Sequence, residues 1–211
     1  HEAGLTSLWD AINNANSITG GVTPTITFDL PAGSIIDASS APLPTIARPV
    51  KIDAVGDDVT VRGGQDGLLF GVGSGGSTLQ GLTFRAFVGT AVRILTTAST
   101  SPAVAATLVT QVVFDQNTIG VQFLGGGNSV ASSHFTGNGV GVLMQAGENQ
   151  ILGNVVAGST TAGVQIIGAT AARNVLFGNT IGPSSGVGVL VVGADGNRIG
   201  GDAAGQGNEV R

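Results

Sequence analysis

The stretch GNSVASSHFTGNGVGVLMQAGENQILGN, residues 127–154, decides the fold because it carries one pattern twice. Asn128 and Asn149 begin the two copies, and an apolar residue, Val130 or Ile151, stands two positions after each. The letters between these residues differ. The pattern therefore constrains a few positions in each copy and leaves the others free to vary.

The same pattern recurs from residue 77 to the end of the chain. Its first column consists of Ser77, Thr107, Asn128, Asn149, Asn174 and Asn197. An apolar residue follows each member after two positions, and in all copies but the last a second one follows five positions later: Phe84, Phe114, Phe135, Val156 and Ile181. A repeat of 21 to 30 residues with several short apolar stretches is typical of a solenoid.

These repeats predict an all-β fold, a single-stranded right-handed parallel β-helix of roughly seven or eight coils. Each coil buries its apolar side only when neighbouring coils stack on it. The right hand follows from the strong preference of parallel crossover connections. At one bend we expect a ladder of stacked, hydrogen-bonded side chains formed by Asn128, Asn149, Asn174 and Asn197.

Residues 6–16, TSLWDAINNAN, predict the one helix of the chain. Ser7 and Asp10 resemble a capping box at its start, and glycines at 20 and 21 are expected to end it. The residues at helical spacing on its apolar face are Leu5, Leu8, Trp9 and Ile12. We expect residues 1–22 to cap the solenoid and residues 23–211 to form one continuous β-helix with an open or truncated C-terminal end.

Composition supports this fold and excludes several classes of function. Glycine accounts for 36 of 211 residues and charged residues for 10%, with a net charge of −5, so nucleic acid is not expected as a partner. No cysteine and two histidines leave no zinc-binding spacing, and we expect neither a metal nor a cofactor. No stretch is long and apolar enough to span a membrane, and no signal-peptide pattern is present.

Two long segments resemble a known family. GLTSLWDAINNAN (4–16) and TITFDLPAGSIIDASSAPLPTIARPVKIDA (25–54) resemble the N-terminal region of bacterial secreted right-handed β-helix proteins, in which a GSLRxAI-type capping helix precedes the coils. GSTLQGLTFRAF (76–87) and GNRIGGDAAGQGN (196–208) resemble their later coils. Trp9 and Ala54 depart from the family pattern, in place of a basic residue and a glycine. The resemblance implies an extracellular or cell-surface protein, often a module of a longer one.

Candidate binding residues follow from the expected stacking. If Phe84, Phe114 and Phe135 point inward, their neighbours point outward, which places Arg85, Asp115 and His134 on one outer face. Arg93 and Gln122 are expected on another outer face. Glu148 and Arg173 are expected to form an ion pair between coils. The segment 96–105 lengthens one coil and is expected to protrude.

Three functions remain open at this level. The first is a non-catalytic module, a rigid scaffold, adhesion or carbohydrate-contacting domain with a polysaccharide or cell-wall glycan as partner. The second is a structural protein that stacks end to end through an uncovered coil. The third is a polysaccharide lyase or hydrolase, although the few acidic residues form no evident catalytic pair and the sequence names no catalytic residue.

Overall fold

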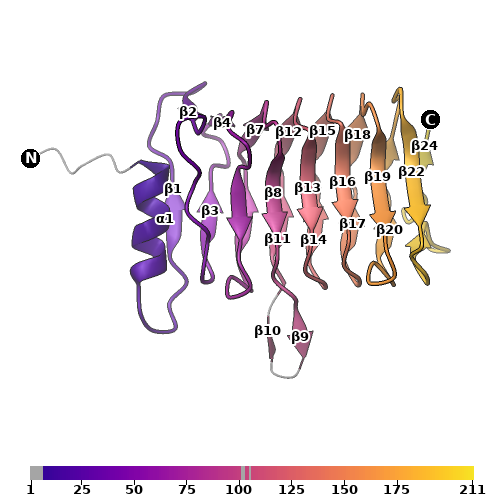
Figure 1. The fold of residues 1–211 in the computed structure, drawn as a ribbon, viewed down its shortest axis with the longest axis horizontal. Helices are drawn as coiled ribbons and strands as arrows, with labels where there is room; N and C mark the ends of the chain where they lie inside the picture. Colours follow the sequence, from indigo (N-terminus) through magenta and orange to yellow (C-terminus); the bar gives the residue numbers. More distant parts are fainter. Residues whose placement is uncertain (1–6, 101–102, 105) are drawn as a thin grey trace, which may run out of the picture.

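In the described part of the chain, one helix is followed by short strands of two to six residues. The computed structural model describes residues 7–100, 103–104 and 106–211. Its coils stack side by side along one axis, from the helix at the N-terminal end to β24 at the C-terminal end (Figure 1).

Most strands form three parallel sheets, A, B and C, and the coils from β3 to β22 pass through them in that order, whereas the first and the last coil have strands in sheets A and B only. Sheet A contains β1 (Thr25–Thr27), β3 (Lys51–Asp53), β6 (Thr78–Gln80), β11 (Leu108–Thr110), β14 (Ser129–Ala131), β17 (Gln150–Leu152), β20 (Val175–Phe177) and β23 (Arg198–Ile199). Sheet B contains β2 (Ile35–Asp37), β4 (Thr60–Arg62), β7 (Thr83–Arg85), β12 (Val113–Asp115), β15 (His134–Thr136), β18 (Val155–Ala157), β21 (Thr180–Ile181) and β24 (Glu209–Val210). Sheet C contains β5 (Leu68–Phe70), β8 (Thr90–Ile94), β13 (Ile119–Phe123), β16 (Val140–Met144), β19 (Ala162–Ile167) and β22 (Val187–Val192). This arrangement is the predicted parallel β-helix.

Apolar columns fill the interior because the strands pair in register. Phe114 pairs with Phe84 on one side and with Phe135 on the other. The ring of Phe114 stacks on both neighbours, at centroid distances of 5.8 and 4.6 Å, and all three side chains are fully buried. The prediction that these residues point inward is confirmed, so their sequence neighbours form the outer wall.

Ladders of side chains stabilise the bends between the sheets. In the predicted ladder, the backbone N–H of Asn128 donates to Asn149 Oδ1 at 2.9 Å, and the N–H of Asn149 donates to Asn174 Oδ1 at the same distance. Asn197 continues this series. The sequence analysis missed two further ladders. One contains Ser133, Asn154, Asn179 and Asn208, and the other contains Asn117 and Asn138.

A residue in the left-handed region precedes the ladder residue at many of these bends. Gly127, Glu148 and Arg173 have φ values of 75°, 64° and 57°, and each stands immediately before a ladder asparagine. The left-handed residue turns the chain sharply, and the ladder residue then points into the bend, where its amide satisfies buried backbone groups.

The helix α1 (Leu8–Ser17) differs from the prediction in two details. Its buried face consists of Leu8, Ile12 and Ala15, whereas Trp9, predicted on this face, is 49% exposed. Ser7 caps its N-terminus as expected and accepts a hydrogen bond from the Asp10 N–H at 3.1 Å. Its last turn ends at Ile18, which is extended, so the expected glycines lie beyond the end. Leu5 lies outside the described residues.

The segment between β8 and β11 leaves the body of the solenoid at one bend. It contains the antiparallel pair β9 (Ser99–Thr100) and β10 (Ala103–Val104), which projects below the stacked coils in Figure 1. The predicted protrusion of residues 96–105 is confirmed for the described part of this segment, and residues 101–102 and 105 lie outside the described residues.

Candidate functional site

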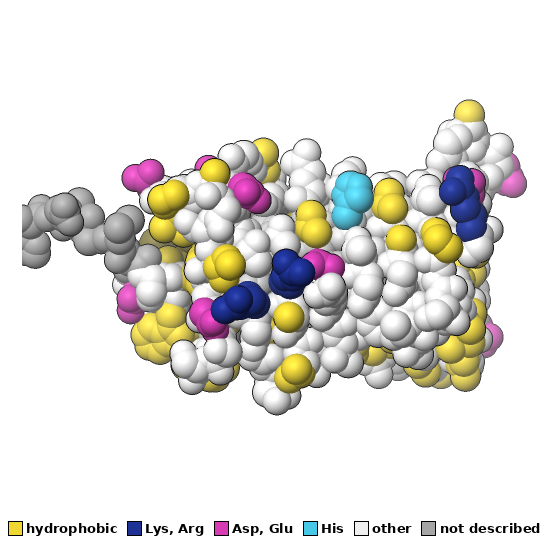
Figure 2. All heavy atoms as spheres, turned by 90° about the horizontal axis from the view of Figure 1, so that it is seen from above, with side chains coloured by type: hydrophobic (Ala, Val, Ile, Leu, Met, Phe, Trp, Pro, Cys, Tyr) yellow, Lys and Arg dark blue, Asp and Glu magenta, His cyan; other side chains and the backbone are white. Residues whose placement is uncertain are grey.

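Four charged residues form a column along the outer wall of sheet B. Asp37, Arg62, Arg85 and Asp115 end β2, β4, β7 and β12, and each pairs in register with the next. Inward-pointing residues such as Val61 and Phe84 precede them, so the alternation of the strand directs the charged side chains outward. We call these four residues the charge column. In the space-filling view of Figure 2, Lys or Arg side chains lie next to each other on one face, with Asp or Glu side chains beside them.

Two ion pairs occupy the two ends of the charge column. Arg62 Nη2 lies 2.9 Å from Asp37 Oδ2, and Arg85 Nε lies 3.1 Å from Asp115 Oδ2. Each arginine therefore pairs with the aspartate on its own side of the charge column. Hydrogen bonds from Ser39 and Arg62 hold the pKa of Asp37 well below its usual range, so this carboxylate stays charged. Exposed ion pairs of this kind contribute about 0 to 1 kcal/mol to stability.

His134 lies beside the charge column and one coil beyond Asp115. It begins β15 and is exposed, and its register partners on the same wall are Val113 and Val155. The structure thus brings Arg85 and Asp115 into direct contact and places His134 on the same wall, in the neighbouring column. Figure 2 shows a histidine side chain on the same face as Lys or Arg side chains.

Arg93 and Gln122, the other two predicted residues, lie on the outer wall of sheet C. Arg93 Nε donates to Gln122 Oε1 at 2.8 Å, and its Nη1 donates to Asp66 Oδ2 at 3.0 Å. Its Nη2 contacts Asp66 and Thr90. Gln122 Nε2 in turn donates to Gln145. Four hydrogen bonds thus engage Arg93 with protein groups, which leaves little of it available to a ligand.

A comparison with known protein families shows to which family this chain belongs. A family model described as a right-handed β-helix region matches residues 52–204, from within β3 to beyond β23. The chain belongs to the right-handed β-helix family. The predicted hand of the coils agrees with this family. Neither a curated protein nor a solved structure gives a significant match to the chain.

The two carboxylates of the charge column stand too far apart to form the pair that hydrolyses glycosides. Asp37 and Asp115 stand three coils apart on the wall of sheet B, which corresponds to about 14 Å at the strand spacing of a sheet. A pair of carboxylates that cleaves glycosides lies about 5 to 9.5 Å apart.

Among the described residues, no group of three or more His, Cys, Asp or Glu side chains could hold a metal ion. The same part of the chain contains no helix long and apolar enough to cross a bilayer.

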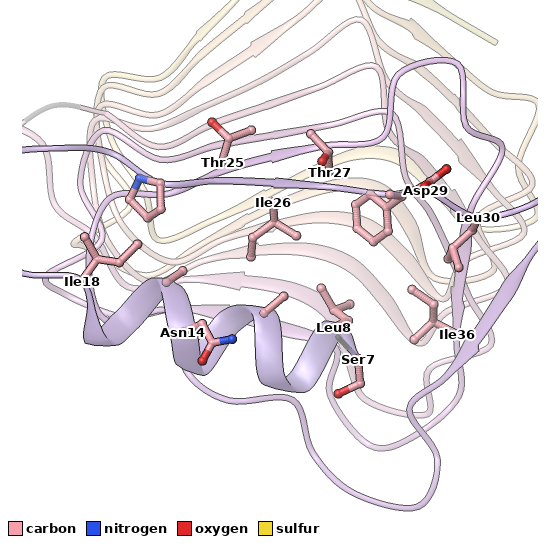
Figure 3. Close-up of a pocket in the computed structure, with 14 residues that line it drawn as sticks. Ser7, Leu8, Asn14, Ile18, Thr25, Ile26, Thr27, Asp29, Leu30 and Ile36 are labelled. Atoms are coloured by element: carbon pink, nitrogen blue, oxygen red, sulfur yellow. The ribbon is translucent and has the colours of Figure 1, made fainter. Parts of the chain in front are cut away.

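The β-helix has a hollow of about 680 Å³ at its N-terminal mouth, between α1, β1 and β2. Figure 3 shows Ile26 pointing from β1 toward α1 across this space. Apolar residues from both sides line it: Leu8, Ala11, Ala15, Ile26, Phe28, Leu30 and Ile36. The hollow thus lies between α1 and the first coil.

The sequence analysis missed Arg62 and Asp37, although one signal pointed to Arg62. The triplet TVR of β4 has the same form as TFR of β7, with an inward residue between two outward ones. The repeat is evident only from residue 77, because the preceding coil has the apolar Val50 at the position that polar residues fill from Ser77 on. Asp66 and Gln145 were also missed, since both stand outside regular strand positions.

Proposed function

We propose that this β-helix is a non-catalytic module outside the cell or on a bacterial cell surface, where it serves as a rigid scaffold that contacts carbohydrate. The charge column is the observation that supports carbohydrate contact. It offers arginine donors and aspartate acceptors at the regular spacing of the coils, about 4.8 Å, on an exposed wall. His134 adds a further polar group to this wall. The resemblance of residues 4–54 to secreted β-helix proteins supports the location.

The wall of sheet B suits recognition better than catalysis. Its carboxylates form ion pairs with Arg62 and Arg85, and the pKa of Asp37 is lowered, so Asp37 cannot donate a proton near neutral pH. A glycosidase needs one carboxylic acid that stays protonated near its working pH. The separation of Asp37 and Asp115 also favours recognition over catalysis, because it exceeds the distance between the two carboxylates of a glycosidase.

Incubation of the protein with neutral and acidic polysaccharides, with and without calcium, tests this proposal. Both depletion of the protein from solution and release of reducing ends or unsaturated products are measured. We expect a polysaccharide to deplete the protein from solution without release of reducing ends or unsaturated products. Product release would instead support a polysaccharide lyase or hydrolase, and replacement of Arg85, Asp115 and His134 by Ala would show whether the wall of sheet B carries the activity.

End-to-end assembly is a second candidate function, favoured by the outer edge of the coil that contains β23 and β24. Ile199 and Val210 are about half exposed there, and the buried Nδ2 of Asn197 has no hydrogen-bond partner among the described residues. The α1 helix covers much of the opposite end (Figure 1). Stacking through the open edge would therefore join two copies tail to tail and would stop at a dimer.

Sedimentation over a range of protein concentrations tests the assembly proposal. We expect a dimer that Ile199→Asp disrupts, because a charge would be placed at the paired edge. Val72→Asp serves as a control, because Val72 is 77% exposed in a bend far along the chain from this edge. A wild-type protein that stays monomeric at high concentration would contradict assembly.

A further inference from the structure

The order of charges in the charge column is unusual for a structural ion-pair network. Along four successive coils the residues are Asp37, Arg62, Arg85 and Asp115, so the two arginines are direct register partners. Alternation of opposite charges would stabilise the wall more, since like charges placed side by side on neighbouring strands repel. The arrangement concentrates positive charge at the centre and negative charge at both ends.

The two central arginines retain unused donors. A guanidinium group has five N–H donors. Arg62 contacts Asp37 through Nη2, and Arg85 contacts Asp115 through Nε. Among the described residues, the other N–H groups of these two arginines have no protein acceptor. Arg93 on sheet C is the contrasting case, because Nε, Nη1 and Nη2 all donate to neighbouring side chains.

We propose that Arg62 and Arg85 together bind the carboxylate of an acidic sugar within a linear glycan, and that Asp37 and Asp115 require the adjacent sugars to be neutral. This inference rests on the proposed carbohydrate contact and specifies its ligand. The carboxylate accepts hydrogen bonds from the free donors of both guanidinium groups, a pairing for which arginine is well suited.

The aspartates set the selectivity of the site. Each lies one coil beyond an arginine, about 7 Å from the midpoint of the arginine pair along the axis of the solenoid. A glycan that runs along this axis would bring its neighbouring sugars over Asp37 and Asp115. Charged carboxylates there accept hydrogen bonds from neutral sugar hydroxyls and repel further acidic groups. The site therefore favours a glycan in which acidic and neutral sugars alternate over a glycan of acidic sugars alone.

Calorimetric titration with three polysaccharides tests the proposal. The probes are hyaluronan, in which an acidic sugar alternates with a neutral one, polygalacturonate, in which every sugar is acidic, and neutral dextran. We expect hyaluronan to bind at least about tenfold more tightly than polygalacturonate, and dextran to bind least. Equal affinity for hyaluronan and dextran would overturn the proposal.

Substitutions locate the binding and its selectivity. Arg62→Gln and Arg85→Gln should each weaken hyaluronan binding by about tenfold, the loss of a charge-assisted hydrogen bond. Arg173→Gln is the matched control, because Arg173 also forms an exposed ion pair between coils, with Glu148, but at a different bend. Replacement of both Asp37 and Asp115 by Asn should raise the affinity for polygalacturonate. Thermal unfolding of each variant verifies that it is folded.

The outcomes separate this inference from the proposed function. Hyaluronan binding that survives both arginine substitutions would overturn the assignment of the site and leave carbohydrate contact intact. If the variant with both Asp37→Asn and Asp115→Asn kept the wild-type preference for hyaluronan over polygalacturonate, the proposed role of the two aspartates in selectivity would be overturned. A wild-type protein that binds none of the three probes would contradict the inference, and absence of binding to the wider polysaccharide panel would contradict the proposed carbohydrate contact as well.

Discussion

At the scale of single residues, the ladder asparagines hold the bends together by serving two coils at once. Asn154 is 1% exposed, and its Oδ1 accepts the backbone N–H of Ser133 at 2.9 Å. Its Nδ2 donates to the carbonyl oxygen of Val130 and to Asn179 Oδ1. A single side chain thus satisfies a buried donor and a buried acceptor of the preceding coil.

Removal of this amide should be costly. Asn154→Ala leaves the buried Ser133 N–H and Val130 carbonyl without partners, so we expect the free energy of unfolding to fall by about 2 to 4 kcal/mol. Asn154→Ser should lower it less, because a serine at a ladder position can still accept, as Ser133 does from the Val112 N–H. Urea unfolding of both variants measures the difference, and equal losses would argue against the ladder as the cause.

The pH dependence of stability gives a second prediction at this scale. Hydrogen bonds from Lys51 and Gln80 lower the pKa of Asp53 from 3.8 to about 2 in the folded protein. Since the unfolded chain keeps a pKa of about 3.9, the carboxylate stabilises the fold fully above about pH 4. This contribution is lost as the pH falls through about 2.

Comparison of the wild type with Asp53→Asn isolates this contribution. The difference between their free energies of unfolding should be constant above about pH 5 and should shrink between about pH 4 and pH 2. Urea unfolding at several pH values measures it. A difference that stays constant down to pH 2 would contradict the assigned pKa of Asp53.

At the scale of elements, α1 closes the apolar end of the tube with only one of its faces. Ile12 is 1% exposed against the core, whereas Trp9 is about half exposed on the outside. Helical periodicity in the sequence located the helix correctly but favoured Trp9 as a core residue. The reason is geometric, since a helix laid across a narrow tube needs only a thin apolar stripe, here Leu8, Ile12 and Ala15.

Two substitutions in α1 test this orientation. Ile12→Ala should lower the free energy of unfolding by about 2 to 4 kcal/mol, because it leaves a cavity under the cap. Trp9→Ala should change it by no more than about 0.5 kcal/mol, as expected for an exposed position. Thermal unfolding of the two variants compares them. A larger loss for Trp9→Ala would show that Trp9 packs against the core after all.

The positions of the coils could be predicted from the sequence where the repeat is regular, and they could not be predicted where it is irregular. From residue 77 on, the inward columns follow from alternation and register, so Arg85, Asp115 and His134 could be placed on one wall. Arg62 was not predicted because Val50 stands at the bend position that serine, threonine or asparagine fills in later coils. The partners of Arg93 could not be foreseen, since Asp66 reaches it from a bend whose path no periodicity fixes.

At the scale of the whole molecule, stability is distributed along the stack. Each coil contacts only its neighbours, so a central coil is supported on both sides and an end coil on one. The strand β16 lies between β13 and β19, and all five of its residues are buried. The terminal strands β23 and β24 have exposed residues only.

Hydrogen exchange should reveal this gradient. We expect the backbone amides of β16 to exchange slowest and those of β23 and β24 to exchange fastest, because local opening from an end breaks the fewest contacts. Exchange followed by mass spectrometry of peptides measures the order. Uniform protection along the chain would show that the solenoid opens as a single cooperative unit.

The protruding segment between β8 and β11 shows how freely such a molecule can acquire new parts. The strands on either side of it keep their register, with Val109 opposite Leu79 and Phe123 opposite Ile94, as though the extra residues were absent. A bend of this solenoid can therefore accept an insertion without repacking the interior. Evolution, or a protein engineer, could graft a foreign loop onto this corner and display it at a fixed height along the rod.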